Sequence, residues 1–364
     1  MRPERGDMRL TQAGGPNTLQ HSSRAESTAM FREAAASAAV VATQLKRNAD
    51  LSHDLAAELK ARPKKAVVTL ARGSSDHCAT YARYLIETRL GILTSSAAPS
   101  VASLYTSGSH LRDTIVLAIS QSGQSPDLLA SAEAARTAGA YLVAFVNAEN
   151  SPLGRIAHCV VPLCAGEESS VAATKSFIAS MAAILNLVAS WSNERDLLTA
   201  LEILPSQLKR AWELDWSAAL ARFRNVENLY VLGRGLGLSV AGEAALKFKE
   251  TCGLHAEAFS AAELQHGPLA IVRKGFPVLV FAQQDETCDG MIRLVRELET
   301  HGAEVTSVGL REPVEGALPF FDAAPAAAPL LQVQCFYRMV NALAVDRGLD
   351  PDRPRHLSKI TETM

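Results

Sequence analysis

The sequence lacks the features of a zinc protein, a secreted protein and a membrane protein. Its six cysteines include no C-x-x-C pair and have no histidine at ligand spacing, so they do not indicate zinc. Residues 1–28 are polar and lack the apolar core of a signal peptide. The longest apolar run, 178–191, falls short of the ~20 residues that span a bilayer, so a buried helix is expected there. We therefore expect a cytoplasmic protein with reduced thiols, no metal and no membrane contact.

An excess of charge of one sign is also absent. The formal net charge of -2 offers no field that would gather nucleic acid or an anionic membrane. A chain of 364 residues can bury a sizeable core and has room for two domains. The expected partner is therefore a small molecule or another copy of the chain.

The two halves of the sequence resemble each other. Residues 67–75 read VVTLARGSS and residues 229–237 read LYVLGRGLG, each an apolar strand that ends in Arg-Gly. These two segments are 162 residues apart. At the same offset, IVLAISQSG (115–123) aligns with PVLVFAQQD (277–285), and at an offset of 163 RTAGAYLVAFVN aligns with ETHGAEVTSVGL. Three landmarks in one order predict an internal repeat.

Each half reads as strand, helix, strand, helix, strand. Near-continuous Val, Ile and Leu in the strands are typical of a parallel sheet covered on both faces. We predict an α/β fold with two tandem doubly wound parallel-sheet domains in three α/β/α layers. The expected parts are a disordered extension (1–28), a first domain with leading helices (29–200), a second domain (201–345) and a tail that closes the active site (346–364).

Two hydroxyl-rich turns follow apolar strands in the first half, ARGSSDH (71–77) and ISQSGQSPD (119–127). Both fall where ligands of parallel sheets bind, beyond the carboxyl ends of the strands. Backbone N–H groups and hydroxyls at a helix N-terminus form an anion cradle, and direct hydrogen bonds are needed because the helix dipole supplies only ~0.3–1 kcal/mol. The candidate donors are Ser74, Ser75, Ser120, Gln121, Ser122 and Ser125, with Thr174 as a further donor.

The anion is more consistent with a small phosphomonoester than with a nucleotide. The turns lack the lysine of a P-loop, and neither ARGSSDH nor GRGLGLS completes G-x-G-x-x-G with a ribose-binding acid. The alternative is that these serines and glycines only form turns and caps. Two such turns at equivalent strand ends make that alternative less favourable.

The second half offers acid, base and lysine candidates. Glu243, Lys247 and Glu250 share one face of a predicted helix, where a solvated ion-pair ladder would also explain them. His266 precedes Gly-Pro and is expected in a loop, whereas the run around His255 looks packed. An aldose–ketose rearrangement needs a ring-opening acid/base near neutral pH and a carboxylate that moves a proton between adjacent carbons.

The charged, proline-rich end of the chain allows two interpretations. As a frayed terminus it would leave Lys359 without a role. If it folds back over the site, Lys359 could instead reach a sugar carbonyl.

Seven motifs together resemble the sugar isomerase (SIS) family over about residues 30–364. They are GSSDH, SQSGQSPD, VAATKSF, EAALKFKE, HAEAF, ELQHGPLA and HLSK. Within the family they resemble the isomerase half of glutamine:fructose-6-phosphate aminotransferase (glucosamine-6-phosphate synthase) and imply flavodoxin-like domains.

The resemblance also implies roles for individual residues. Glu250 would transfer the proton between C1 and C2, His266 would open the ring, and Lys247 and Lys359 would lie near C1 and C2. In that family the histidine reaches across a subunit boundary, which implies at least a homodimer. The implied phosphate cradle is Ser75, Ser120, Gln121, Ser122 and Ser125, and the other implied substrate contacts are Val171, Ala172 and Thr174.

The sequence departs from the synthases at several points. Their nucleophilic N-terminal cysteine has no counterpart, since the first cysteine is Cys78, so glutamine is not expected as the nitrogen source. Gln124 stands where the synthases usually carry an acid and Ala173 where they usually carry serine. GSSDH, APSVASLY, SQSGQSPD and VAATKS together are most similar to SIS-type glucosamine-6-phosphate deaminases.

The leading expectation is therefore an isomerising glucosamine-6-phosphate deaminase without metal or organic cofactor. It would convert glucosamine 6-phosphate and water to fructose 6-phosphate and ammonia. Three alternatives remain open: ammonia-dependent synthesis of glucosamine 6-phosphate, deamination of galactosamine 6-phosphate, and a sugar-phosphate sensor without turnover.

Overall fold

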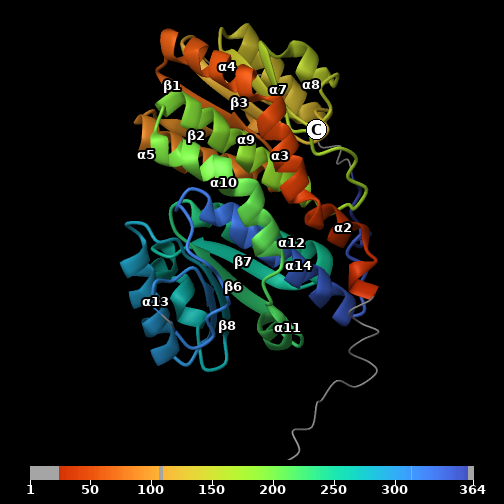
Figure 1. Ribbon diagram of the computed structural model, residues 1–364, viewed down its shortest axis with the longest axis vertical. Helices are drawn as coiled ribbons and strands as arrows, with labels where there is room; N and C mark the ends of the chain where they lie inside the picture. Colours follow the sequence, from red (N-terminus) through yellow and green to blue (C-terminus); the bar gives the residue numbers. More distant parts are fainter. Residues whose placement is uncertain (1–23, 106–109, 313, 360–364) are drawn as a thin grey trace, which may run out of the picture.

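The computed structural model describes residues 24–105, 110–312 and 314–359, which form two α/β units (Figure 1). The strands of the first unit are β1 (Ala66–Leu70), β2 (Thr94–Ser96), β3 (Thr114–Ser120), β4 (Tyr141–Val146) and β5 (Cys159–Pro162). Its helices are α2 (Ala29–Ala35), α3 (Ser37–Arg47), α4 (Ala49–Ala61), α5 (Ser74–Leu90), α6 (Pro99–Ser103), α7 (Pro126–Thr137), α8 (Pro152–Ile156) and α9 (Lys175–Ser192).

The second unit has a similar composition of elements. Its strands are β6 (Asn228–Gly233), β7 (His255–Ser260), β8 (Pro277–Phe281) and β9 (Glu304–Val308). Its helices are α10 (Arg195–Trp212), α11 (Ser217–Phe223), α12 (Gly237–Cys252), α13 (Cys288–Thr300) and α14 (Ala328–Asp346), with 3₁₀ turns η1 (Glu263–His266) and η2 (Pro268–Ile271).

Both sheets are parallel and repeat one strand order. The first runs β2-β1-β3-β4-β5 and the second β7-β6-β8-β9, so four strands correspond one to one. Helices α5 and α12 follow the first strand of each set, and α7 and α13 follow the third. The predicted repeat and the predicted pair of parallel-sheet domains are confirmed.

Strand β3 shows why its sequence is apolar throughout. Ile115, Leu117 and Ile119 belong to the core cluster that contains α5 and α9, whereas Val116 and Ala118 pack with residues of α7. All seven residues of β3 are buried because both faces of the sheet are covered. The hydroxyl-rich turn that follows β3 is therefore anchored to a buried strand.

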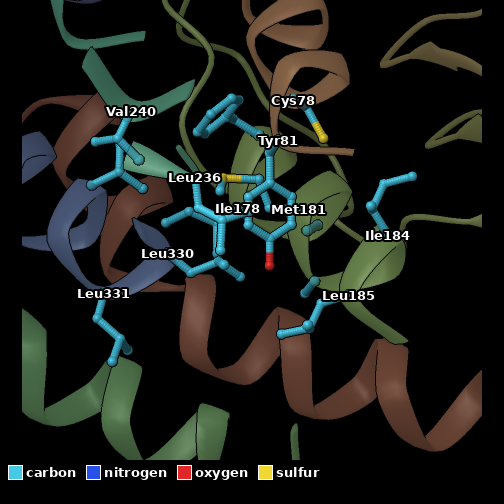
Figure 2. Close-up of a cluster of buried hydrophobic side chains, with 14 of the residues drawn as sticks. Cys78, Tyr81, Ile178, Met181, Ile184, Leu185, Leu236, Val240, Leu330 and Leu331 are labelled. Carbon is cyan, nitrogen blue, oxygen red and sulfur yellow. The ribbon is translucent and has the colours of Figure 1, made fainter. Parts of the chain in front are cut away.

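The two sheets are joined by a layer of packed helices. Figure 2 shows side chains from α5 (Cys78, Tyr81), α9 (Ile178, Met181), α12 (Val240) and α14 (Leu330) in one cluster. Helix α9 contains the longest apolar run of the sequence and is almost entirely buried in this layer, as predicted. Within the described ranges, no helix has the length and apolar character to traverse a bilayer. This packing brings the start of α5 close to the end of α12.

The folded region begins before residue 29, where the sequence analysis placed its boundary. Ala25 is buried and its carbonyl accepts a hydrogen bond from the Asn341 side chain at 2.8 Å. The Thr28 hydroxyl accepts the N–H of Phe31 and caps α2. Ala25 and Thr28 are therefore part of the folded structure rather than of an extension. The rest of the expected extension, residues 1–23, lies outside the described residues.

Candidate active site

A pocket of about 360 Å³ opens at the carboxyl ends of β1 and β3. Two turns of the first domain face it, together with the 171–173 segment and the C-terminal tail. Its polar lining consists of Arg72, Ser74, Ser75, Ser120, Gln121, Ser122, Ser125 and Lys359. The structure therefore brings all six predicted cradle residues to one cavity, and Lys359 with them.

The turn after β3 has a geometry that requires glycine. Ser120 Oγ accepts the N–H of Gly123 at 3.0 Å, and Gly123 has a φ of +62°. A Cβ on Gly123 would lie 2.2 Å from Ser151 Oγ and 2.7 Å from Ser151 Cβ. The chain then enters α7 with Pro126 in its first turn. Because α5 also begins at this pocket, two helix N-termini favour an anion here.

An ion pair holds the two turns together. Arg72 Nε and Nη2 donate to Asp127 Oδ2 at 2.9 and 2.7 Å, and Asp127 is buried. Neither residue was among the predicted site residues. Arg72 could have been identified from the sequence, because the internal repeat has an arginine, Arg234, at the equivalent position.

Gly123→Ala is expected to destabilise the protein more than Gly91→Ala does. Both residues have positive φ, a conformation that costs an L side chain about 1–2 kcal/mol, but nothing lies within 4 Å of a Cβ on Gly91. The contact with Ser151 adds about 1–3 kcal/mol of overpacking at Gly123. Urea unfolding of both variants measures the difference. Equal destabilisation would show that the turn relaxes freely around the new methyl group.

A buried charge cluster from α12 lies beside the cradle. Lys247 Nζ lies 2.5 Å from Glu250 Oε2 and 3.3 Å from Glu243 Oε1, and it donates to Ser74 Oγ at 3.1 Å. The Tyr337 hydroxyl donates to Glu243 Oε1 at 2.8 Å. Lys247 and Glu243 are fully buried, whereas the Glu250 side chain is 19% exposed. The solvated ladder allowed by the sequence is therefore wrong for Lys247 and Glu243.

The cluster shifts two protonation equilibria. Burial raises the pKa of Glu243 to about 7, against the opposing attraction of Lys247. Burial lowers the pKa of Lys247, but the carboxylates of Glu243 and Glu250 outweigh it and leave the pKa above its usual value. Lys247 is therefore a cation at neutral pH. Glu250 is the most exposed of the three side chains, although neither Glu250 nor Lys247 is on the pocket lining.

A second buried carboxylate positions the tail lysine. Glu168 accepts hydrogen bonds from the N–H of Thr174 and from the N–H and hydroxyl of Ser176, at 2.6 to 3.2 Å. Lys359 Nζ lies 3.1 Å from Glu168 Oε2 and donates to the Ser170 carbonyl at 2.6 Å. Burial raises the pKa of Glu168, but Lys359 and these donors outweigh it and hold the pKa below its usual value.

The tail is also tied to the start of helix α2. Asp352 accepts the N–H groups of Ala29 and Met30 at 2.7 Å each, and its carbonyl accepts the N–H of Val171 at 3.1 Å. The tail thus packs against α2 and the 171–173 segment on its way to the pocket. Sequence reasoning missed Glu168 and Asp352, because neither stands in a periodic element.

Some predicted contacts lie away from the pocket. Val171 lines it, but Ala172 and Thr174 are fully buried, and Ala173 takes their place on the lining. His266 is exposed at the end of η1 and is not part of the lining in this single chain. His255 was expected to be packed and is exposed, because it starts the edge strand β7.

In the second domain, the side chain of Gln283 fills the space at the equivalent turn. Ala282 and Gln283 stand where the repeat places Ser120 and Gln121. Gln283 is 1% exposed, and its Oε1 accepts the N–H of Gly237 at the start of α12 at 3.1 Å. A Cβ on Gly237 would lie 2.3 Å from Gln283 Nε2, so the amide occupies the space next to the helix end.

The sequence of this chain is similar to a known protein family and to several known proteins. Residues 60–190 and 222–310 each match the family described as SIS domain. Glutamine–fructose-6-phosphate aminotransferase [isomerizing] of Sulfurisphaera tokodaii is 32% identical over 301 residues, which cover 80% of this chain and 49% of that protein. The chain spans about half the length of the curated relatives it matches.

Solved structures share the whole architecture. A protein from Silicibacter pomeroyi, described as a candidate phosphosugar isomerase, is 41% identical with a TM-score of 0.85, and the match covers 89% of this chain and all of that one. Glucosamine-6-phosphate deaminase from Thermotoga maritima is 22% identical with a TM-score of 0.75, over 92% of this chain and all of that one. The second similarity is one of fold.

Proposed function

Because the chain belongs to the SIS domain family, with two SIS domains in tandem, we propose that it is a phosphosugar isomerase that deaminates glucosamine 6-phosphate. The products are fructose 6-phosphate and ammonia. The observation that carries the proposal is the contact of Lys247 with both Ser74 and Glu250. These contacts connect Glu250, the proposed proton-transfer carboxylate, to Ser74 of the proposed phosphate cradle through one side chain, which supports the proposal.

The phosphate group occupies the cradle of the first domain. Hydroxyls of Ser75, Ser120, Ser122 and Ser125 and the side-chain amide of Gln121 line that cavity, at the N-termini of α5 and α7. Hydrogen bonds to a charged oxyanion contribute about 1.5–3 kcal/mol each, more than the helix dipoles do. The sugar carbons then extend toward Lys247, Glu250 and Lys359.

The reaction is a proton transfer followed by hydrolysis. After the ring opens, Glu250 takes the proton from C2 of the amino aldehyde and returns it to C1, which leaves an imine at C2. Water adds to C2 and the carbon–nitrogen bond breaks, so ammonia leaves and the C2 ketone of fructose 6-phosphate remains. The ammonium groups of Lys247 and Lys359 polarise the neighbouring oxygen or nitrogen.

Ring opening is assigned to His266 of a second subunit. The imidazole is exposed and lies outside the pocket lining of its own chain, so a neighbouring copy is needed to present it. The working unit under this proposal is at least a homodimer. No residue of the pocket is reserved for a metal or organic cofactor in this scheme.

One observation favours the opposite direction as a second candidate. The matched relatives are named as aminotransferases, and the same proton-transfer residues would serve ammonia-dependent synthesis of glucosamine 6-phosphate. Glutamine hydrolysis is assigned to neither direction here.

Purified protein incubated with glucosamine 6-phosphate and no glutamine is expected to release ammonia and fructose 6-phosphate in equal amounts. Both products are measured in the same samples over time. Glucosamine without the phosphate is the control and should give no turnover at matched concentration, because it cannot occupy the cradle. Tight binding of glucosamine 6-phosphate with neither product formed would refute the deaminase, and turnover of galactosamine 6-phosphate alone would reassign its substrate.

A further inference from the structure

A second pocket of about 370 Å³ lies at the opposite, amino end of the first sheet. It is formed by the starts of β3 and β4, the residues after α4, the last turn of α7 and the approach to β5. It shares no lining residue with the catalytic pocket. Its polar lining includes Arg62, Arg112, Arg136, Thr114, Tyr141 and His158, and we call it the arginine pocket.

The charge of the arginine pocket is unbalanced. The one acid on its lining, Asp113, lies 3.3 Å from Lys65, outside the pocket. Arg62 pairs with Glu58 at 2.6 Å. Among the residues that the structure describes, neither Arg112 nor Arg136 has an ion-pair partner or a side-chain hydrogen bond. Arg112 and Arg136, two exposed arginines on the lining of one cavity, therefore have no counter-ion among the described residues.

One wall of the pocket is held rigidly. The Arg62 guanidinium lies 3.8 Å from the centre of the Tyr141 ring, and the Tyr141 hydroxyl donates to Glu58 Oε2 at 2.6 Å. His158 stacks on Tyr141 with the ring centres 5.1 Å apart. Its Nδ1 accepts the N–H of Leu142 at 3.0 Å, so the neutral imidazole carries its proton on Nε2. Burial lowers the pKa of His158, and the charges of Arg136 and Arg62 lower it further.

The internal repeat shows that the fold does not require an arginine at the position of Arg136. RTAGAY of the first domain aligns with ETHGAE of the second, so Glu299 stands at the position of Arg136 and Glu304 at that of Tyr141. Arg224 corresponds to Arg62 but is tied to Asp346 at 2.5 Å. The same edge of the second sheet thus has an acid in place of Arg136 and a paired arginine in place of Arg62, with Lys274 at the position of Arg112.

We propose that the arginine pocket binds a phosphate dianion, either free or as the phosphoryl group of a small metabolite. Guanidinium groups match the geometry of phosphate oxygens and keep their charge at every physiological pH. Two arginines without counter-ions favour a doubly charged ligand, and the His158 Nε2–H adds a neutral donor. This site is independent of the catalytic cradle and of the proposed reaction.

Titration of the full-length protein with inorganic phosphate tests the proposal, followed through the imidazole NMR resonances of His158. The wild type is expected to show a saturable shift that chloride at matched ionic strength does not reproduce. Arg112→Ala/Arg136→Ala should weaken the apparent affinity at least about tenfold, because each arginine contributes charge-assisted hydrogen bonds. The control is Arg273→Ala/Arg293→Ala, which removes two exposed arginines of the second domain and should leave the titration unchanged.

The two possible sources of the phosphoryl group give different outcomes. A matching titration with glucose 6-phosphate that shifts His158 identifies a phosphomonoester ligand, whereas a shift with inorganic phosphate alone identifies the free ion. Absence of a saturable shift with both probes overturns the proposal. An unchanged titration in Arg112→Ala/Arg136→Ala also overturns it, because the arginines would then not hold the anion.

Discussion

Glu250→Gln is expected to lower kcat for glucosamine 6-phosphate deamination by about 10²–10⁴-fold with little change in KM. Glutamine keeps the size of the side chain and can still accept a hydrogen bond from Lys247, which lies 2.5 Å from the carboxylate. It cannot take a proton from C2 and return it to C1. Steady-state kinetics with coupled detection of fructose 6-phosphate measure both constants.

The control for this variant is Glu202→Gln on α10, which removes an exposed carboxylate far along the chain from the cluster. It should behave as the wild type. If Glu250→Gln retained full turnover, or lost activity only through KM, Glu250 would not be the base, and the role would have to pass to another group that reaches the sugar.

Lys247→Met is expected to reduce the free energy of unfolding by about 3–5 kcal/mol at pH 8. Methionine fills similar space, but it leaves the buried Glu243 without the cation that lies 3.3 Å from it. Removing one partner of a buried ion pair costs far more than removing both. Guanidinium unfolding followed by circular dichroism measures the loss, and Lys249→Met, at an exposed position of the same helix, should cost little.

The pH dependence of the Lys247→Met variant identifies the cause. Burial already raises the pKa of Glu243 to about 7 in the wild type, and loss of Lys247 raises that pKa further. An acid whose pKa is raised by folding favours the folded state at low pH, and that contribution is lost as the pH rises through the folded-state value. The deficit should therefore shrink toward pH 5, and Glu243→Gln in the same chain should recover part of it at pH 8. A deficit independent of pH would point to a packing defect instead.

The sequence was sufficient to predict the paired sheets and the position of the hydroxyl-rich turn after β3. Strand β3 is buried on both faces, so its composition is apolar without interruption and its end is marked by the first polar residues. The second sheet could be recognised because it repeats the spacing of the first. Ser120 and Ser122 could be placed at the edge of the sheet because they lie at the end of this strand and just after it.

Contacts between distant segments could not be read from the same patterns. Glu168 lies in an irregular segment, and it is buried only because backbone and hydroxyl donors from the start of α9 surround it. The exposure of His255 depends on β7 lying at the edge of its sheet, which hydrophobic spacing does not specify. Thr174 was chosen for its hydroxyl, but the residue is fully buried and is not on the pocket lining.

The hydrogen bond between Lys247 and Ser74 joins two halves that carry the same architecture and different chemistry. The first half has an open pocket at its helix end, whereas Gln283 fills the equivalent space in the second half. Under the proposed function, the second half contributes Glu250 and Lys247 from further along the corresponding helix. Under the proposed function, the two similar domains thus supply different parts of one active site. A substitution at Ser74 or Lys247 would then disturb the contribution of both domains, because these two side chains share one hydrogen bond.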